Sequence, residues 1–236
     1  MKKTITLLLA IMMTLSLAAC GSQSASASQP APTSAQPVAE ATPEVTVQPE
    51  NTAGQPDQNT DGRKILIVYF SPANSDTADA VSSATPRAGE QSSVAYVAQL
   101  VGEQVDADMA QIVAAEAYPL PYNDTVDRAR KEQNDNARPA FTLDVNPEEY
   151  DVIFFGYPIW WYHLPMIVRN FFESYDFSGK TIAPFVLHAG SRDGGTFGEI
   201  RELEPNATVL DGLAVAGERA GSAQQAVSDW LAGLSY

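Results

Sequence analysis

The segment from Asp151 to Pro165, DVIFFGYPIWWYHLP, constrains the fold of this chain more than any other stretch. Val152 to Phe155 are all apolar, which predicts a strand covered on both faces of a parallel sheet. Gly156 ends this predicted strand. A row of aromatic residues follows between Pro158 and Pro165. Open α/β sheets bind ligands at the carboxyl ends of their strands, so we expect a binding site in this row.

From Arg63 onward, segments typical of strands alternate with segments typical of helices. Strands are predicted at Lys64 to Phe70, Met109 to Ala114, Asp151 to Gly156, Thr181 to Leu187 and Thr208 to Ala216. Helices are predicted at Ser92 to Gln104, Asn123 to Glu132, Met166 to Ser174, Phe197 to Leu203 and Ser222 to Leu234. This alternation predicts one α/β domain over residues 63–236, with a doubly wound five-stranded parallel sheet in a three-layer α/β/α arrangement.

The first 20 residues are typical of an export signal. Lys2 and Lys3 precede an apolar run, Ile5 to Leu17, which is too short to span a bilayer. Cys20 is the only cysteine of the chain and follows Ala18-Ala19. This segment resembles the lipobox of bacterial lipoproteins, which implies a diacylglyceryl group on Cys20 and a lipid-anchored, extracytoplasmic place in the bacterial cell envelope. An ordinary cleaved signal with an incidental cysteine is the alternative.

Residues 21–62 contain no aromatic and no basic side chain and are rich in Ser, Ala, Gln, Pro and Thr. Such a composition buries too little apolar surface to order a chain, so we predict a disordered tether with a reach of roughly 35 Å. The formal net charge of the whole chain is −15, which argues against nucleic acid or anionic lipid as the partner of the domain. Membrane attachment is therefore expected through the N-terminal lipid only.

Four segments together resemble the flavodoxin-like family of FMN-binding proteins. They are KILIVYFS at 64–71, FGYPIWWYHLP at 155–165, SYDFSGKTIAPFVLHAGS at 174–191 and PNATVLDGLAV at 205–215. The second and third are similar to a subgroup of flavodoxins and flavin-dependent reductases. The resemblance covers most of residues 63–236 and implies the strand order 2-1-3-4-5 and FMN as the cofactor.

The resemblance also implies which residues hold FMN. Its phosphate is expected near the start of the first helix, where free amides and the helix dipole favour an anion. The candidates there are Ser71, Gln91, Ser92 and Ser93. The ring is expected between the loops after the third and fourth strands, whose candidates are Pro158, Ile159, Trp160, Trp161, Tyr162 and His163, and His188, Ala189, Gly190 and Ser191. The aromatic side chains offer stacking partners and an apolar wall.

Some of these residues have other interpretations. Residues Pro72 to Glu90 stand where family members have a short turn, so backbone donors or Asn74 are alternatives for the phosphate. The two tryptophans can instead pack against Phe171 and Phe172, and the two serines can serve as helix caps.

Other classes of site are disfavoured by the sequence. Two histidines and no paired acidic motif argue against a zinc site. The segment Gly179-Lys180-Thr181 lacks the first glycine of a P-loop and precedes a strand rather than a helix.

We therefore expect an exported flavoprotein that transfers electrons, acting as a small flavin-dependent reductase for which a quinone-type acceptor is one candidate. The sequence assigns neither catalytic residues nor the electron donor. Because His163, His188 and Arg192 lie on the two loops beside the ring, we also expect two-electron reduction to be favoured. The alternative is a surface binding module that has kept the scaffold and lost FMN, since fold alone does not decide function.

Overall fold

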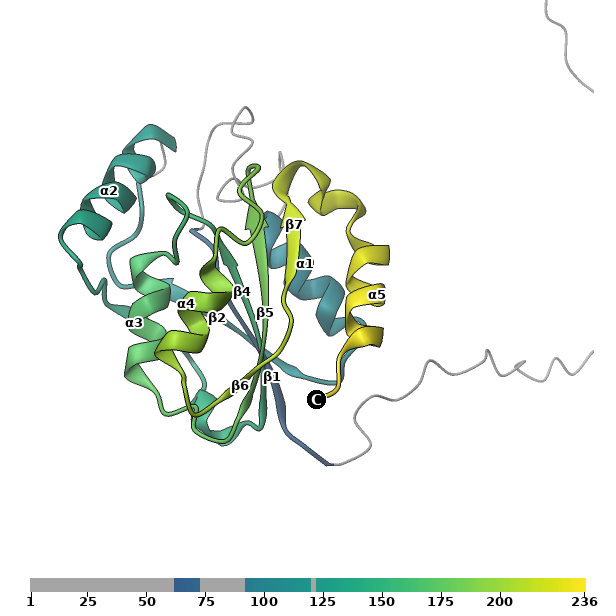
Figure 1. Ribbon diagram of the computed structural model, residues 1–236. Coiled ribbons are helices and arrows are strands. Elements are labelled where there is room, and N and C mark those ends of the chain that lie inside the picture. The colour runs from purple at the N-terminus through teal and green to yellow at the C-terminus, as the bar shows by residue number, and fades with distance from the viewer. Residues whose placement is uncertain (1–61, 73–91, 120–121) are drawn as a thin grey trace, which may run out of the picture. The chain divides into compact units, whose positions relative to one another are not determined.

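A mostly parallel sheet runs through the described part of the chain, which is residues 62–72, 92–119 and 122–236 of the computed structural model (Figure 1). Its parallel strands are β1 (Ile65–Phe70), β2 (Asp108–Ala114), β4 (Val152–Pro158), β5 (Thr181–His188), β6 (Thr208–Val209) and β7 (Leu213–Ala216). The short strand β3 (Phe141–Thr142) pairs antiparallel with β2 at the edge. The order is β3-β2-β1-β4-β5-β6, and β7 also pairs with β5.

The predicted order of five parallel strands is confirmed, with one difference at its end. The strand predicted from Thr208 to Ala216 consists of β6 and β7, which pair with the two ends of β5. Between them, a Cβ on Gly212 would lie 2.4 Å from the ring of Phe197, so this position leaves room for the ring only as glycine. Strand β3 was not predicted, because two residues give no periodic signal.

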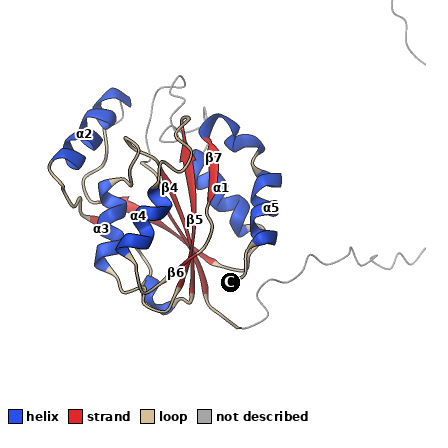
Figure 2. Cartoon of the chain, in the orientation of Figure 1, coloured by secondary structure: helices blue, strands red, loops and turns tan. Residues whose placement is uncertain are grey.

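Helices cover both faces of the sheet, as a doubly wound fold requires (Figure 2). They are α1 (Ser93–Gly102), α2 (Tyr122–Asn134), α3 (Met166–Ser174), α4 (Thr196–Leu203) and α5 (Gln224–Gly233), with 3-10 turns η1 (Pro147–Glu149) and η2 (Gly217–Ser222). Helices α1 and α5 lie on one face, and α3 and α4 lie on the other. Helix α2 stands farther out, beside α3.

The apolar strand predicted from Val152 lies at the centre of two hydrophobic cores. All residues of β4 are buried, and their side chains alternate between the two faces. Phe155 stacks on Phe171 of α3 with ring centroids 4.9 Å apart, while Phe154 meets Trp230 of α5 edge-to-face at 5.7 Å. Burial of this kind stabilises a domain by about 1.5–3 kcal/mol for each large apolar side chain. The sheet is therefore a rigid support for the loops at its carboxyl end.

Several predictions fall outside the described residues. These are the signal at 1–20 with Cys20, the tether up to residue 61, and residues 73–91, which include Gln91. In the part of the chain that the structure describes, no helix is long and apolar enough to cross a membrane.

Candidate functional site

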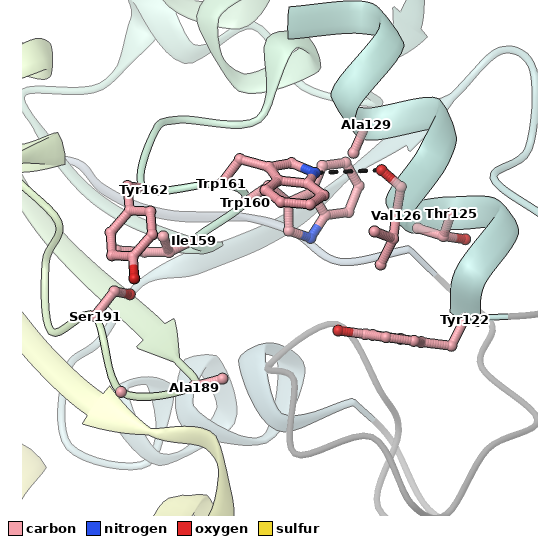
Figure 3. A pocket seen from close by; sticks show the side chains of 11 residues that line it. Tyr122, Thr125, Val126, Ala129, Ile159, Trp160, Trp161, Tyr162, Ala189 and Ser191 are labelled. Carbon is pink, nitrogen blue, oxygen red and sulfur yellow. Dashed lines mark hydrogen bonds between the residues drawn. The ribbon is translucent and has the colours of Figure 1, made fainter.

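A cavity of about 270 Å³ opens at the carboxyl ends of β4 and β5 (Figure 3). It is lined by Tyr122, Thr125, Val126, Ala129, Ile159, Trp160, Trp161, Tyr162, Ala189, Gly190 and Ser191. These residues come from helix α2, from the loop after β4 and from the loop after β5. None of the lining side chains is a carboxylate, an ammonium, a guanidinium or an imidazole. The cavity therefore suits an uncharged, flat group.

The aromatic residues after β4 lie on a tight turn, residues 160–163, which we call the aromatic turn. The N–H of His163 donates to the carbonyl oxygen of Trp160 at 3.0 Å, and the N–H of Trp160 donates back at 3.2 Å. Between them, Trp161 and Tyr162 have φ angles of 52° and 66°. Two successive positive φ angles are typical of a type I′ turn, which usually carries Asn and Gly. Bulky residues in this conformation cost about 1–3 kcal/mol each, and such strain gathers at functional sites.

Trp160 is the buried residue of the aromatic turn, with 8% of its surface exposed. Its ring meets Phe70 at 5.5 Å and Tyr118 at 5.1 Å between centroids, both edge-to-face. Trp160 thus has the packing role considered for it, but its ring partners among the described residues are Phe70 and Tyr118 instead of Phe171 and Phe172. Trp160 therefore lines the cavity as a residue of the hydrophobic core.

Trp161 is the exposed neighbour, with 38% of its surface accessible, and Tyr162 is exposed to 67%. The indole N–H of Trp161 donates to the carbonyl oxygen of Val126 at 3.2 Å. The guanidinium carbon of Arg130 lies 3.8 Å from the centroid of the Trp161 ring, a cation–π contact. Both contacts come from α2, so they fix the position of the aromatic turn relative to this helix.

A network behind the cavity fixes Tyr118. Its hydroxyl donates to Glu132 at 2.9 Å, and Arg128 donates to the other oxygen of the same carboxylate at 2.8 Å. The Arg128 guanidinium also lies over the Tyr118 ring, 4.0 Å from its centroid. Burial, together with the neighbouring Glu132 carboxylate, raises the pKa of Tyr118. The phenol therefore remains protonated and acts as a wall for Trp160 and an anchor for α2.

The loop after β5 closes toward the aromatic turn through small residues. A Cβ on Gly194, whose φ is +57°, would lie 3.2 Å from the carbonyl oxygen of Tyr162. Within this loop the N–H of Gly190 donates to Nδ1 of His188 at 3.0 Å, so neutral His188 carries its proton on Nε2. Burial and then the nearby Arg192 guanidinium lower the pKa of His188, which keeps the ring uncharged at neutral pH.

Seven of the ten residues predicted beside the ring line the cavity, and three do not: Pro158, His163 and His188. Pro158 is buried at the end of β4. Nδ1 of His163 lies 3.0 Å from Oε1 of Glu199 on α4. His188 and Arg192 line a different groove, beside β7. The cations on which the two-electron expectation depends are therefore not brought to the cavity.

Three of the predicted phosphate residues, Ser71, Ser92 and Ser93, belong to the described part of the chain and lie at the same end of the sheet. Ser71 directly follows Phe70, whose ring touches Trp160. The Ser71 hydroxyl is buried and has no hydrogen-bond partner among the described residues. Buried polar groups are nearly always paired, so this hydroxyl is suited to a bound acceptor such as a phosphate oxygen. Ser92 is the N-cap of α1, since its Oγ accepts the N–H of Ala95 at 3.1 Å.

The first turn of α1 also suits an anion, because it contains no acidic residue. Ser93 is buried in this turn. Together with the uncharged cavity, the unpartnered Ser71 hydroxyl means that the residues present fit both ends of an FMN molecule.

The wall provided by α2 was not foreseen. Tyr122, Val126 and Ala129 are spaced i, i+4 and i+7, which places them on one face of an otherwise polar helix. This spacing is the signal that could have identified the wall. In the described segments, no group of His, Cys, Asp and Glu is arranged to hold a metal ion.

Three solved structures of flavoproteins are similar to this chain. A candidate flavoprotein from Bacteroides uniformis is 29% identical with a TM-score of 0.55, and the alignment covers 72% of this chain and 99% of that one. A second candidate flavoprotein, from Bacteroides eggerthii, is 28% identical with a TM-score of 0.52, covering 70% and 98%. A flavoprotein from Lactobacillus acidophilus, solved in complex with FMN, is 18% identical with a TM-score of 0.49, covering 68% and 97%.

No protein with a curated description matches the chain. The flavodoxin family model matches residues 64–234, which include every strand and helix described above. Since this match spans most of the sequence, the chain belongs to the flavodoxin family.

Proposed function

We propose that this protein binds FMN and transfers electrons as a small flavin-dependent reductase. The observation that carries the proposal is the uncharged, aromatic-lined cavity at the ends of β4 and β5. A flat ring system is held best by apolar walls and stacking partners with few polar groups, which matches this lining. FMN would supply the redox chemistry, while the protein supplies position and electrostatics.

Different residues contact the ring and the phosphate of FMN. Trp161 and Tyr162 offer flat faces to the ring, and Ala189 to Ser191 allow a close approach of the backbone. The buried Trp160 offers an apolar surface beneath the ring. Ser71, whose hydroxyl has no hydrogen-bond partner in the described part of the chain, donates to the phosphate.

A titration with two flavins tests the proposal. The purified domain should quench FMN fluorescence saturably at micromolar concentrations. Ser71→Ala should weaken FMN binding about 10- to 100-fold, since a hydrogen bond to a charged group is worth about 1.5–3 kcal/mol. Riboflavin, which lacks the phosphate, is the matched control and should bind both proteins equally. A protein that quenches neither flavin would be the surface binding module considered as the alternative.

We also propose that the chain is exported and anchored in a bacterial cell envelope through a diacylglyceryl group on Cys20. The proposal is supported by the apolar run that ends at Leu17-Ala18-Ala19-Cys20. Two acyl chains hold a protein on a membrane where a single chain does not. Cys20→Ala should move the protein out of the membrane fraction, whereas the control Ser22→Ala should not. Complete retention of the Cys20→Ala protein with membranes would contradict the anchor.

A further inference from the structure

A second groove, separate from the candidate FMN cavity, runs along strand β7. Its volume is about 1140 Å³, and the groove and the cavity share no lining residue. The residues that line the groove come from β7, α4, η2, α5 and the loop after β5. Because α4 and α5 lie on opposite faces of the sheet, a groove between them follows the outer edge of β7 (Figure 1). We call it the β7 groove.

Strand β7 has an unpaired edge in this groove. It pairs with β5 on one side, and no other described strand pairs with it. On the free edge of a strand, every second residue directs its N–H and C=O outward. Residues Leu213–Ala216 include neither a charged residue nor a proline, which commonly protect an exposed edge. The backbone of β7 is therefore open to an added strand.

The groove has room for one extended chain. Ala214 of β7 and Ala226 of α5 are exposed, and a Cβ on Gly198 of α4 would meet no atom within 4 Å. Phe197, which is partly buried, adds an apolar surface. A second copy of this chain does not suit the groove, because its own α4 and α5 flank its β7 and would meet these helices before the strands could pair. The occupant is therefore a single extended segment.

Two arginines lie at the end of the groove where β7 ends. His188 and Ala216 are partners in the register of β5 and β7, so the segments after these strands begin side by side. Arg192 follows in one segment and Arg219 in the other, and both line the groove. Among the described residues, neither guanidinium has a hydrogen-bond or ion-pair partner. Both are thus free to donate to a carboxylate, whose geometry a guanidinium matches.

Two acidic residues, Asp193 and Glu218, also line this end of the groove. The Asp193 carboxylate already accepts the N–H of Gly195 at 3.2 Å, and Glu218 is exposed. Burial lowers the pKa of His188 most, the Arg192 guanidinium lowers it further, and Asp193 raises it by less. At His188, Arg192 therefore outweighs Asp193, although the formal net charge of the whole chain is −15.

We propose that the β7 groove binds the C-terminal tail of a partner protein as an added strand parallel to β7, with the terminal carboxylate held by Arg192 and Arg219. A carboxyl terminus beside Ala216 fixes this direction, because β7 itself ends there. Strand addition gives affinity through backbone hydrogen bonds, and capture of the carboxylate sets the register of the tail. The inference goes beyond electron transfer and does not depend on FMN.

Fluorescence anisotropy of the full chain with a short peptide tests the proposal. The probe is Gly-Ser-Thr-Val-Thr-Val with a neutral fluorophore on its N-terminus and a free carboxyl terminus, and saturable binding is expected below about 1 mM. The same peptide with a C-terminal carboxamide should have a Kd about fivefold higher or more. A peptide with N-methyl groups on alternate residues should not bind measurably, because it lacks the donors of a strand. No binding of the carboxylate probe, or equal binding of either modified peptide, would overturn the proposal.

One substitution fills the groove. Gly198→Leu should raise the Kd of the carboxylate probe about 10-fold, because the new side chain occupies space that the added strand needs. Gly233→Leu is the matched control, since this helical glycine also has open space around its Cβ but does not line the groove. Thermal unfolding verifies that both variants are folded. A folded Gly198→Leu protein with an unchanged Kd would overturn the proposal.

Charge variants test the end that holds the carboxylate. Arg192→Gln and Arg219→Gln should each raise the Kd about threefold, as expected for exposed ion pairs, and Glu218→Gln should lower it about twofold. The control Lys131→Gln removes a positive charge outside the groove and should change nothing. Arginine variants that bind like the parent, or a Lys131→Gln effect of the same size, would overturn the carboxylate site. FMN affinity should be unchanged in all four variants, so the outcome is independent of the proposed electron transfer.

Discussion

Two neighbouring tryptophans, Trp160 and Trp161, have opposite surroundings in this molecule. Trp160 is buried against Phe70 and Tyr118, whereas Trp161 stands at the cavity wall with Arg130 on its outer face. Residue type does not explain the difference, since the side chains are identical. The backbone turns between them, since Trp161 has a positive φ and Trp160 does not, and the two rings have different neighbours. One aromatic run thus contains a residue of the core, Trp160, and a partly exposed residue, Trp161, that we propose contacts the FMN ring.

The largest expected effect is on the free energy of unfolding, when the buried Trp160 is replaced. Trp160→Ala should lower the free energy of unfolding by about 3–5 kcal/mol, because it empties a site enclosed by two other rings. Trp161→Ala should lower it by about 1 kcal/mol or less, since that ring is partly exposed. Urea unfolding of both proteins without FMN measures the difference. Equal losses would show that the two rings do not have separate roles.

For FMN affinity we expect the partly exposed Trp161 to matter more than the buried Trp160. Trp161→Ala removes a stacking contact worth about 1 kcal/mol, so FMN affinity should fall about fivefold. The control is Trp230→Phe, which changes a tryptophan of the opposite core, far along the chain from the cavity lining. A fluorescence titration that gives the same Kd for parent and Trp161→Ala would remove Trp161 from the ring site.

Strain in the aromatic turn can be separated from ring contact at Tyr162. Tyr162→Asn places a residue that tolerates positive φ at this position, so the free energy of unfolding should rise by about 1 kcal/mol. Tyr162→Phe keeps the ring and the strain and should leave stability unchanged. Thermal unfolding of the apo-proteins distinguishes the two. A destabilised Asn variant would mean that the ring contributes more contact than its exposure suggests.

Much of the fold could be predicted because it depends on local patterns. The apolar run from Val152 and the alternation of strands and helices identify the doubly wound sheet, and helix α3 has the predicted bounds. The split of the last strand into β6 and β7 was not predicted, because the composition from Thr208 to Ala216 does not show where pairing is interrupted.

The candidate site could be predicted only in part. Its two loops follow from strand ends, which the sequence marks. The α2 wall depends on how a polar helix packs in three dimensions, and only the spacing of Tyr122, Val126 and Ala129 hints at it. The directions of His163 and His188 depend on partners, Glu199 and the Gly190 amide, that pattern does not reveal. Two adjacent positive φ angles on aromatic residues are also invisible in the sequence.

The smallest expected effect is the coupling energy between Arg130 and Trp161, and it tests directly whether the two tryptophans differ in their contacts with α2. Arg130 covers Trp161 at an exposed site, where a cation–π contact is worth about 0.5–1 kcal/mol. A double-mutant cycle of Arg130→Met with Trp161→Ala should therefore give a coupling energy of about that size in urea unfolding. The same cycle with Trp160→Ala should give a coupling near zero, since within the described residues the guanidinium of Arg130 lies over Trp161, whereas Trp160 packs against Phe70 and Tyr118. Comparable coupling energies in both cycles would contradict this expectation. They would mean that Arg130 depends on the aromatic turn as a whole and not on its contact with Trp161.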